Sequence, residues 1–191
     1  GEELDKIVPI EGPTKTFYGN SGAEAIEAAM KVARWHTGRQ GYIAYIGSFH
    51  GRTLGAVSLT ASKPYQRRKF APLIPGVHHV PYPYCYRCPF NLEEKSCDMA
   101  CVDYIDDYLF HKYVAPEEVS MLMVEPIQGE GGYVVPPKAY FPKLKKLLDE
   151  HGILFAVDEV QSGVGRTGKW FAVEHWDVKP DIVVGAKGIA A

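Results

Sequence analysis

Short apolar segments that alternate with amphipathic helices constrain the fold of this chain more than any other feature. The clearest of them is 153–158, in which every residue except the last is apolar, as in parallel strands buried on both faces. Segments 42–46, 120–125 and 182–186 are similar, and apolar residues at helical spacing predict helices over 22–37, 98–111 and 140–151. Strands that alternate with helices predict an α/β domain with a largely parallel sheet.

Composition narrows the class of protein further. The 191 residues are 46% hydrophobic and 23% charged, which is typical of an ordinary globular protein. Lys and Arg number 21 against 23 Asp and Glu, so the net charge is −2. A nearly neutral chain has no general attraction for nucleic acid or for an anionic membrane. No apolar run approaches the roughly 20 residues of a membrane-spanning helix, so we expect neither nucleic acid nor membrane as a partner.

The four cysteines all lie in one irregular excursion of the chain, at about 62–101. Their spacing is C-x2-C followed by C-x3-C, which could hold zinc or an iron–sulfur cluster. Reduced thiols, with one buried on a helix face, or a disulfide are the alternatives. Cysteines confined to one stretch favour a cytoplasmic protein over a secreted disulfide scaffold. The candidate metal ligands are Cys85, Cys88, Cys97 and Cys101.

Two glycine-containing segments begin where ligands of parallel α/β sheets bind, outside the carboxyl ends of the strands. Ser21 is a natural N-cap for the helix at 22–37, and the small residues beside it leave N–H groups open to an anion. Segment 47–53 presents an aromatic ring, an imidazole and a guanidinium between glycines. Taken singly, the first is equally a simple helix cap and the second a packed loop.

Acidic and basic side chains follow the remaining strands. Glu125 and Glu130 flank a glycine-rich loop, which is either the wall of a site or a solvated turn. Asp158 ends the apolar strand, where burial without a cationic partner would be costly. Lys187 follows segment 182–186 and is either an amine nucleophile or a lysine that extends to solvent. Together these residues match pyridoxal phosphate, which needs an anion site, an aromatic ring, an acid for its ring nitrogen and a lysine.

Five motifs in this order resemble the class III aminotransferases, the fold type I group of pyridoxal-phosphate enzymes, and most of all their 4-aminobutyrate branch. They are NSGAEA (20–25), FHGRT (49–53), VEPIQGE (124–130), DEVQ with GRTG (158–168) and AKG (186–188). The resemblance implies a three-layer α/β/α large domain. It also implies that residues 1–191 are part of this PLP-binding domain, as an internal fragment without the small C-terminal domain and inactive alone.

The resemblance assigns cofactor contacts to several residues. Phe49 would stack on one face of the cofactor ring with His50 beside it, and Val160 would pack on the opposite face. The residues expected to bind the phosphate, mainly through main-chain N–H groups, are Ser21, Gly22 and Ala23.

The same resemblance assigns the reacting groups. Asp158 would pair with the protonated ring nitrogen, and Gln161 would hydrogen-bond the ring hydroxyl. Lys187 would form the Schiff base and carry the proton. Arg52 would bind the distal carboxylate of the substrate, and Glu130 would pair with a second arginine that is not in this chain.

These assignments imply a transaminase that moves an amino group from an ω-amino acid of the 4-aminobutyrate type to 2-oxoglutarate, as a cytoplasmic homodimer at full length. Alternatives within the class are an acetylornithine or ornithine aminotransferase, a dialkylglycine decarboxylase or an aminomutase. An alternative from another class is a metal-binding interaction module built on the cysteine loop.

Overall fold

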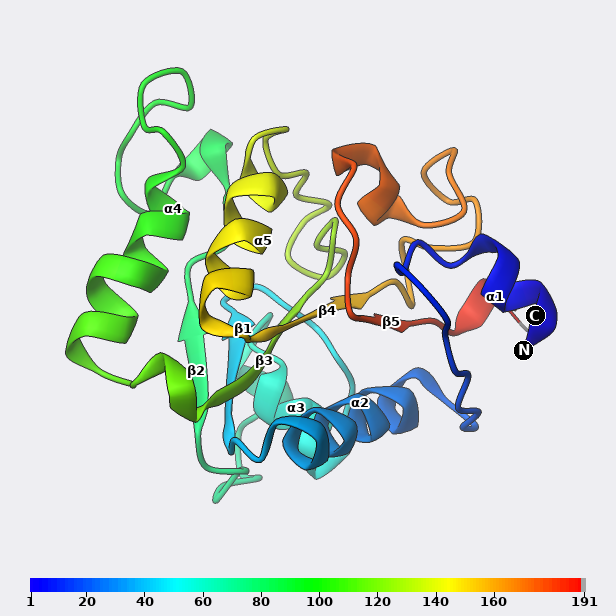
Figure 1. Cartoon of the computed structure of the whole chain (residues 1–191). Coiled ribbons are helices and arrows are strands. Elements are labelled where there is room, and N and C mark those ends of the chain that lie inside the picture. Colours follow the sequence, from blue (N-terminus) through cyan, green and yellow to red (C-terminus); the bar gives the residue numbers. More distant parts are fainter. Residues whose placement is uncertain (190–191) are drawn as a thin grey trace.

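The computed structural model describes residues 1–189 and has one sheet of five parallel strands at its centre (Figure 1). The strand order is β2-β1-β3-β4-β5, and every neighbouring pair is parallel. The strands are β1 (Gly41–Tyr45), β2 (Val77–Val80), β3 (Val119–Val124), β4 (Leu154–Asp158) and β5 (Ile182–Val184). The predicted parallel α/β fold is confirmed, and the carboxyl ends of the strands share one edge.

Helices cover both faces of the sheet and complete three layers (Figure 1). On one face lie α2 (Gly22–Thr37) and α3 (Leu54–Leu59), and on the other lie α4 (Ala100–Asp103) and α5 (Tyr140–His151). Helix α1 (Glu2–Ile7) lies near the described C-terminal end. Short 3₁₀ turns occupy Pro64–Gln66, Cys85–Arg87, Pro116–Glu118, Ala172–Trp176 and Lys187–Ile189.

The alternation of side chains along the strands builds two separate cores. Tyr42, Met121 and Ala156 pack toward α2 and α3, while their chain neighbours Ile43 and Leu122 face α4 and α5. Because successive strand residues point to opposite faces, a strand with helices on both sides is buried on both faces and is mostly apolar. This arrangement explains why β3 is buried at every position.

Local capping explains the bounds of the two longest helices. The Ser21 hydroxyl accepts the N–H of Glu24 at 3.2 Å, as its position before the apolar pattern predicted. Gly38 and Gly152 end α2 and α5 in the left-handed conformation, with φ of 72° and 62°. Both helices have the predicted bounds.

Three parts of the sequence prediction were wrong. The helix expected over 98–111 begins only at Ala100, and from Tyr104 to Phe110 it has π-helical hydrogen bonds. The excursion at about 62–101 is not wholly irregular, because it contains the edge strand β2, whose two histidines hid its strand pattern. Helices α1 and α3 were not predicted, since each is only six residues long.

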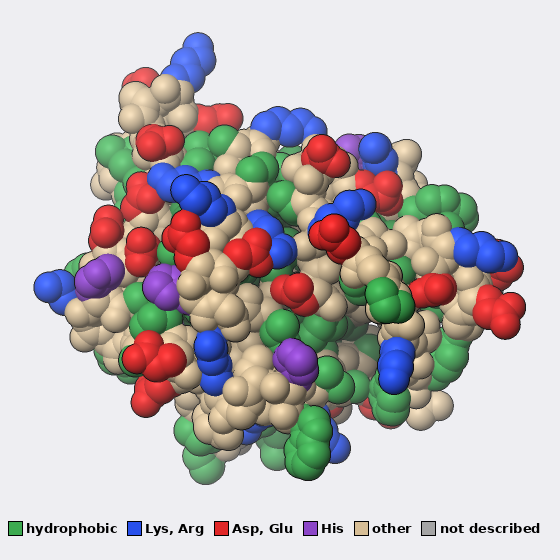
Figure 2. Space-filling model, viewed as in Figure 1, with side chains coloured by type: hydrophobic (Ala, Val, Ile, Leu, Met, Phe, Trp, Pro, Cys, Tyr) green, Lys and Arg blue, Asp and Glu red, His purple; other side chains and the backbone are tan. Residues whose placement is uncertain are grey.

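The surface carries no dominant charge on the face that Figure 2 shows. Lys and Arg side chains alternate there with Asp and Glu. Among residues 1–189, no helix is both long enough and apolar enough to cross a membrane.

Candidate cofactor and substrate site

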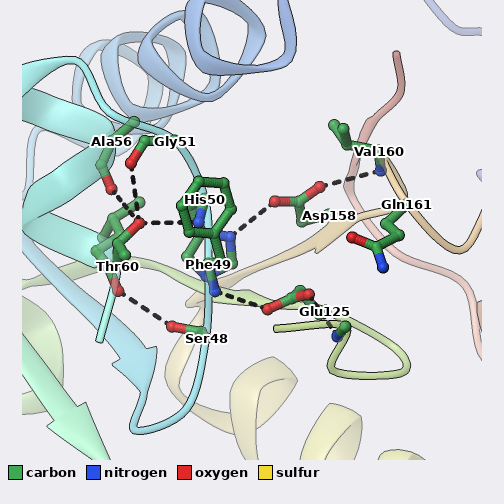
Figure 3. Close-up of polar contacts among 12 residues, drawn as sticks. Ser48, Phe49, His50, Gly51, Ala56, Thr60, Glu125, Asp158, Val160 and Gln161 are labelled. Atoms are coloured by element: carbon green, nitrogen blue, oxygen red, sulfur yellow. Dashed lines mark hydrogen bonds and ion pairs between the residues drawn. The ribbon is translucent and has the colours of Figure 1, made fainter. Parts of the chain in front are cut away.

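A buried acid–imidazole pair forms the centre of the candidate site (Figure 3). Asp158, the last residue of β4, is 4% exposed, and its Oδ2 lies 2.8 Å from His50 Nδ1. Its other oxygen, Oδ1, accepts the N–H of Val160 at 3.0 Å. The sequence predicted that burial of an acid at this position would be costly without a cationic partner, and in the structure its side-chain partner is the His50 imidazole.

Glu125 occupies the corresponding position directly after β3. Its side chain joins two loops: Oε1 accepts the N–H of Phe49 at 2.8 Å, and Oε2 accepts the N–H of Gly129 at 3.0 Å. Burial raises the pKa of this carboxyl and the nearby Asp158 adds to the rise, while His50 and the two N–H groups oppose it. Sequence reasoning quoted Glu125 within a motif and missed this role.

The loop that carries Phe49 and His50 is fixed at several points. The His50 N–H donates to Thr60 Oγ1 at 2.9 Å. Gly51 has a φ of 137°, and a Cβ there would come within 2.8 Å of Ala23 Cβ and 2.9 Å of Ala56 Cβ. Only glycine allows this backbone to approach the first turn of α2 so closely. The predicted ring-stacking loop and the predicted phosphate-binding turn are therefore in direct contact.

A cavity of about 740 Å³ contains another part of the predicted site. Its walls include Ser21 and Gly22 at the start of α2, together with Val160 and Lys187. A Cβ on Gly22 would lie 3.1 Å from both methyl groups of Val160, so Gly22 keeps this part of the cavity open. The N–H groups of the first helical turn have no acceptor within the helix itself, and the helix dipole favours an anion there.

Lys187 lies at the open end of β5, where the 3₁₀ turn Lys187–Ile189 begins. It is exposed, has a φ of 50°, and its Nζ donates to Gln161 Oε1 at 3.4 Å. The structure thus brings Lys187 to Gln161 and to the cavity that Val160 also lines, as expected for residues from adjacent strand ends. The exposed amine is therefore not desolvated in this structure.

The two predicted substrate residues have different surroundings. Arg52 is exposed, and no hydrogen bond or ion pair joins it to Glu130 among the described residues. Glu130 instead forms an ion pair with Lys63, whose Nζ lies 2.6 Å from Glu130 Oε2. The hydrogen bond and the charge of Glu130 raise the pKa of Lys63. Sequence reasoning missed Lys63, which is an isolated lysine without a motif.

The cysteines do not form a metal site in this structure. Within residues 1–189, no group of three or more His, Cys, Asp or Glu side chains is arranged to hold a metal ion. The four cysteines are free thiols, and only Cys101 is buried. The zinc or iron–sulfur hypothesis for Cys85, Cys88, Cys97 and Cys101 is not supported by this geometry, which corresponds to the alternative of reduced thiols.

The residues present fit pyridoxal phosphate. Among the described residues, His50 Nε2 is a buried nitrogen without a hydrogen-bond partner, next to an acid that has only two donors. Gly22 keeps a space open beside Val160 at the start of a helix. An anion-binding helix start, a buried acid and a lysine within hydrogen-bond reach of Gln161 are the donor set that this cofactor requires.

Comparison with known proteins identifies the class of this fold and site. The family Aminotransferase class-III matches residues 1–191. The chain therefore belongs to the class III aminotransferase family, as the five motifs predicted.

Three relatives illustrate the range within the family. The chain is 51% identical to a leucine/methionine racemase of Thermococcus litoralis over 97% of this chain and 41% of that protein. It is 42% identical to a probable 4-aminobutyrate aminotransferase of Bacillus subtilis, over 100% of this chain and 43% of the relative. A PLP-bound amine transaminase from an uncultivated Pseudomonas species superposes with a TM-score of 0.83 at 31% identity, covering 90% of this chain and 39% of that one.

The chain thus spans about two fifths of the length of the curated relatives it matches. These two relatives are named for different reactions, one as a racemase and the other as an aminotransferase.

Proposed function

We propose that residues 1–191 are part of the PLP-binding large domain of a pyridoxal-phosphate-dependent transaminase. At full length the protein would be a cytoplasmic homodimer that moves an amino group from an ω-amino acid of the 4-aminobutyrate type to 2-oxoglutarate. The observation that carries the proposal is the buried Asp158–His50 pair beside the first turn of α2. A buried carboxylate next to an anion-binding helix start suits a ligand with a basic ring nitrogen and a phosphate.

Pyridoxal phosphate, when bound, supplies an electron-accepting ring that stabilises negative charge on the substrate carbon. Asp158 would keep the ring nitrogen protonated. His50 orients the Asp158 carboxylate through Oδ2, and the Val160 N–H fixes Oδ1. Ser21, Gly22 and the following Ala23 present main-chain N–H groups to the phosphate.

The proton is moved by Lys187. Its Nζ hydrogen-bonds to Gln161 Oε1, and its exposed side chain is free to approach the substrate carbon. A primary amine at this position removes a proton from that carbon and returns it elsewhere, which is the step that amino transfer requires. Phe49 and Val160 would hold the two faces of the ring and exclude water from the reacting centre.

Arg52 binds the substrate carboxylate in this proposal. Its guanidinium is exposed, and bidentate pairing with a carboxylate is its strongest available interaction. Glu130, held by Lys63, lies on the loop that follows β3 and would discriminate between amino donors by their charge.

The test uses the full-length protein with pyridoxal phosphate, 4-aminobutyrate and 2-oxoglutarate, and measures glutamate. We expect Lys187→Ala to abolish turnover. Arg52→Ala should raise KM for 4-aminobutyrate by about tenfold to a hundredfold, the worth of one charge-assisted contact, and change KM for an uncharged amine far less. Arg68→Ala, at another exposed arginine, is the matched control. Equal losses for both donors would refute the role of Arg52, and a wild-type protein without glutamate formation would refute the reaction.

A second candidate function is amino-acid racemisation, which the 51% identity to a leucine/methionine racemase favours. A racemase returns the proton to the same carbon from the opposite face, so it needs no keto-acid acceptor. Chiral chromatography of L-leucine or L-methionine incubated without 2-oxoglutarate separates the two reactions, because only a racemase then forms the D-enantiomer. A panel with acetylornithine, ornithine and dialkylglycine as donors tests the other members of the class.

A further inference from the structure

Glu125 is a buried acid that the proposed chemistry does not use. It is 5% exposed, and both carboxylate oxygens accept main-chain N–H groups, Oε1 from Phe49 and Oε2 from Gly129 (Figure 3). Its own carbonyl accepts the hydroxyl of the buried Tyr82 at 2.9 Å. The residue is therefore fixed at its main chain and at its side chain. A carboxylate whose two oxygens already receive hydrogen bonds is poorly suited to exchange protons with a substrate.

The two N–H groups belong to the loops that carry the site. Phe49 lies in the loop after β1, directly before His50, and its N–H donates to Glu125 Oε1. Gly129 lies directly before Glu130, and a Cβ on Gly129 would come within 2.6 Å of Gln161 Nε2. One side chain thus joins the loop of the stacking ring to the loop that packs against Gln161.

The two oxygens of the carboxyl group together satisfy both donors. An amide of the same shape can accept one N–H through its oxygen, but it then directs an NH2 group at the other N–H. An aspartate keeps the charge and is shorter by one methylene, so it cannot reach both loops at the observed distances. The two substitutions therefore remove different parts of the same bridge.

We propose that Glu125 is a positioning residue that holds the main chain of Phe49 and of Gly129 in a fixed relative position. Through these two residues it orients the Phe49 ring and the Gln161 side chain toward bound pyridoxal phosphate. This inference rests on the proposed function for the identity of the ligand. The bridge between the two loops exists without the cofactor, so its two halves are tested separately.

The first measurement is amide hydrogen exchange on the full-length apoprotein. We expect Glu125→Gln to accelerate exchange at Phe49 or Gly129 by about tenfold or more, since a buried hydrogen bond to a charged group is lost. Glu159→Gln is the matched control. Glu159 is buried after β4 and accepts the N–H of Val173 at 2.8 Å and the Ser162 hydroxyl, with no contact to either loop. The control should leave exchange at Phe49 and Gly129 unchanged.

The second measurement is the induced circular dichroism of bound pyridoxal phosphate, expressed per cofactor bound. We expect Glu125→Gln to reduce this signal by about half or more while the cofactor still binds. Glu125→Asp should reduce the signal less. Glu159→Gln should keep the wild-type signal even if the substitution lowers Tm. Unchanged exchange at both amides, or an induced signal that stays at the wild-type value, would overturn the inference. If Glu125→Gln does not fold, Glu125→Asp is judged by the same two criteria. A wild-type protein that binds no pyridoxal phosphate would refute the proposed function, and the exchange measurement would still decide whether Glu125 bridges the loops.

Discussion

Replacing His50 by phenylalanine should destabilise the protein strongly, because it leaves Asp158 buried without its side-chain partner. Asp158 is 4% exposed, and His50 Nδ1 is the donor 2.8 Å from Oδ2. Breaking one side of a buried pair costs about 3–5 kcal/mol. The Val160 N–H continues to serve Oδ1, and phenylalanine fills most of the space of the imidazole. We therefore expect a loss at the lower end, about 3 kcal/mol.

A double-mutant cycle isolates the pair from the effects of packing. Asp158→Asn removes the buried charge, so His50→Phe in that background should cost far less than in the wild type. The coupling energy should be about 2 kcal/mol, within the range observed for residues in contact. Urea unfolding of the full-length apoprotein, followed by fluorescence and by circular dichroism, measures all four corners of the cycle. Coincident transitions by the two probes justify the two-state treatment.

Two results would refute this reasoning. If the two single substitutions add without coupling, the 2.8 Å contact is not an energetic unit. If His50→Phe is neutral, Asp158 has another partner or becomes neutral without cost. In either case the role of His50 in orienting Asp158 would have to be abandoned, while the membership of the family would stand.

Three further predictions concern residues around the site. Burial lowers the pKa of His79 from 6.5 to about 4. As the pH drops from 6.5 to 4, the unfolded chain therefore takes up the His79 proton first, and the free energy of unfolding falls. Urea titrations at several pH values should show that His79→Asn removes up to about 3 kcal/mol of that loss. Lys63→Ala should leave Tm nearly unchanged, because its ion pair with Glu130 is exposed. Steady-state kinetics should show KM for 2-oxoglutarate raised a few-fold, because the charge of Glu130 is then unopposed. Burial raises the pKa of the Cys101 thiol to about 12, which disfavours the reactive thiolate. Mass spectrometry after iodoacetamide treatment should therefore find Cys101 modified far more slowly than Cys88, and equal rates would contradict the burial of Cys101.

Most of the sheet and its long helices could be predicted from the sequence because their signals are local. Ser21 and Gly152 mark helix ends by the chemistry of their own backbone and side chain, and β4 is recognisable as a wholly apolar run. Helix α3 has no such signal. Its first turn is held by Glu27 of α2, whose Oε1 accepts the Thr53 hydroxyl at 2.6 Å and the Gly55 N–H at 2.8 Å. A short helix stabilised by a side chain from a distant segment cannot be inferred from its own six residues.

The same distinction applies to the site. The sequence predicts candidate site residues, since each lies at or after the end of a strand and parallel strands end at one edge. It did not indicate which of them touch. His50 and Asp158 are 108 residues apart, and the choice of partner depends on the register between β1, β3 and β4. Lys63 reaches Glu130 from outside any motif, through a contact that only the folded loops create.

The two acids that follow β3 and β4 have different roles because they receive different donors. Glu125 receives two main-chain N–H groups, which cannot rotate away or change protonation, so its charge is committed to the backbone of two loops. Asp158 receives one main-chain N–H and one imidazole, and among the described residues that imidazole has a second buried nitrogen without a partner. A pair with capacity for a further hydrogen bond can respond to a ligand. A carboxylate whose donors are all main-chain N–H groups can only hold the surrounding backbone in position. The Asp158–His50 pair therefore keeps hydrogen-bonding capacity for a ligand, whereas the Glu125 side chain is committed to the surrounding loops.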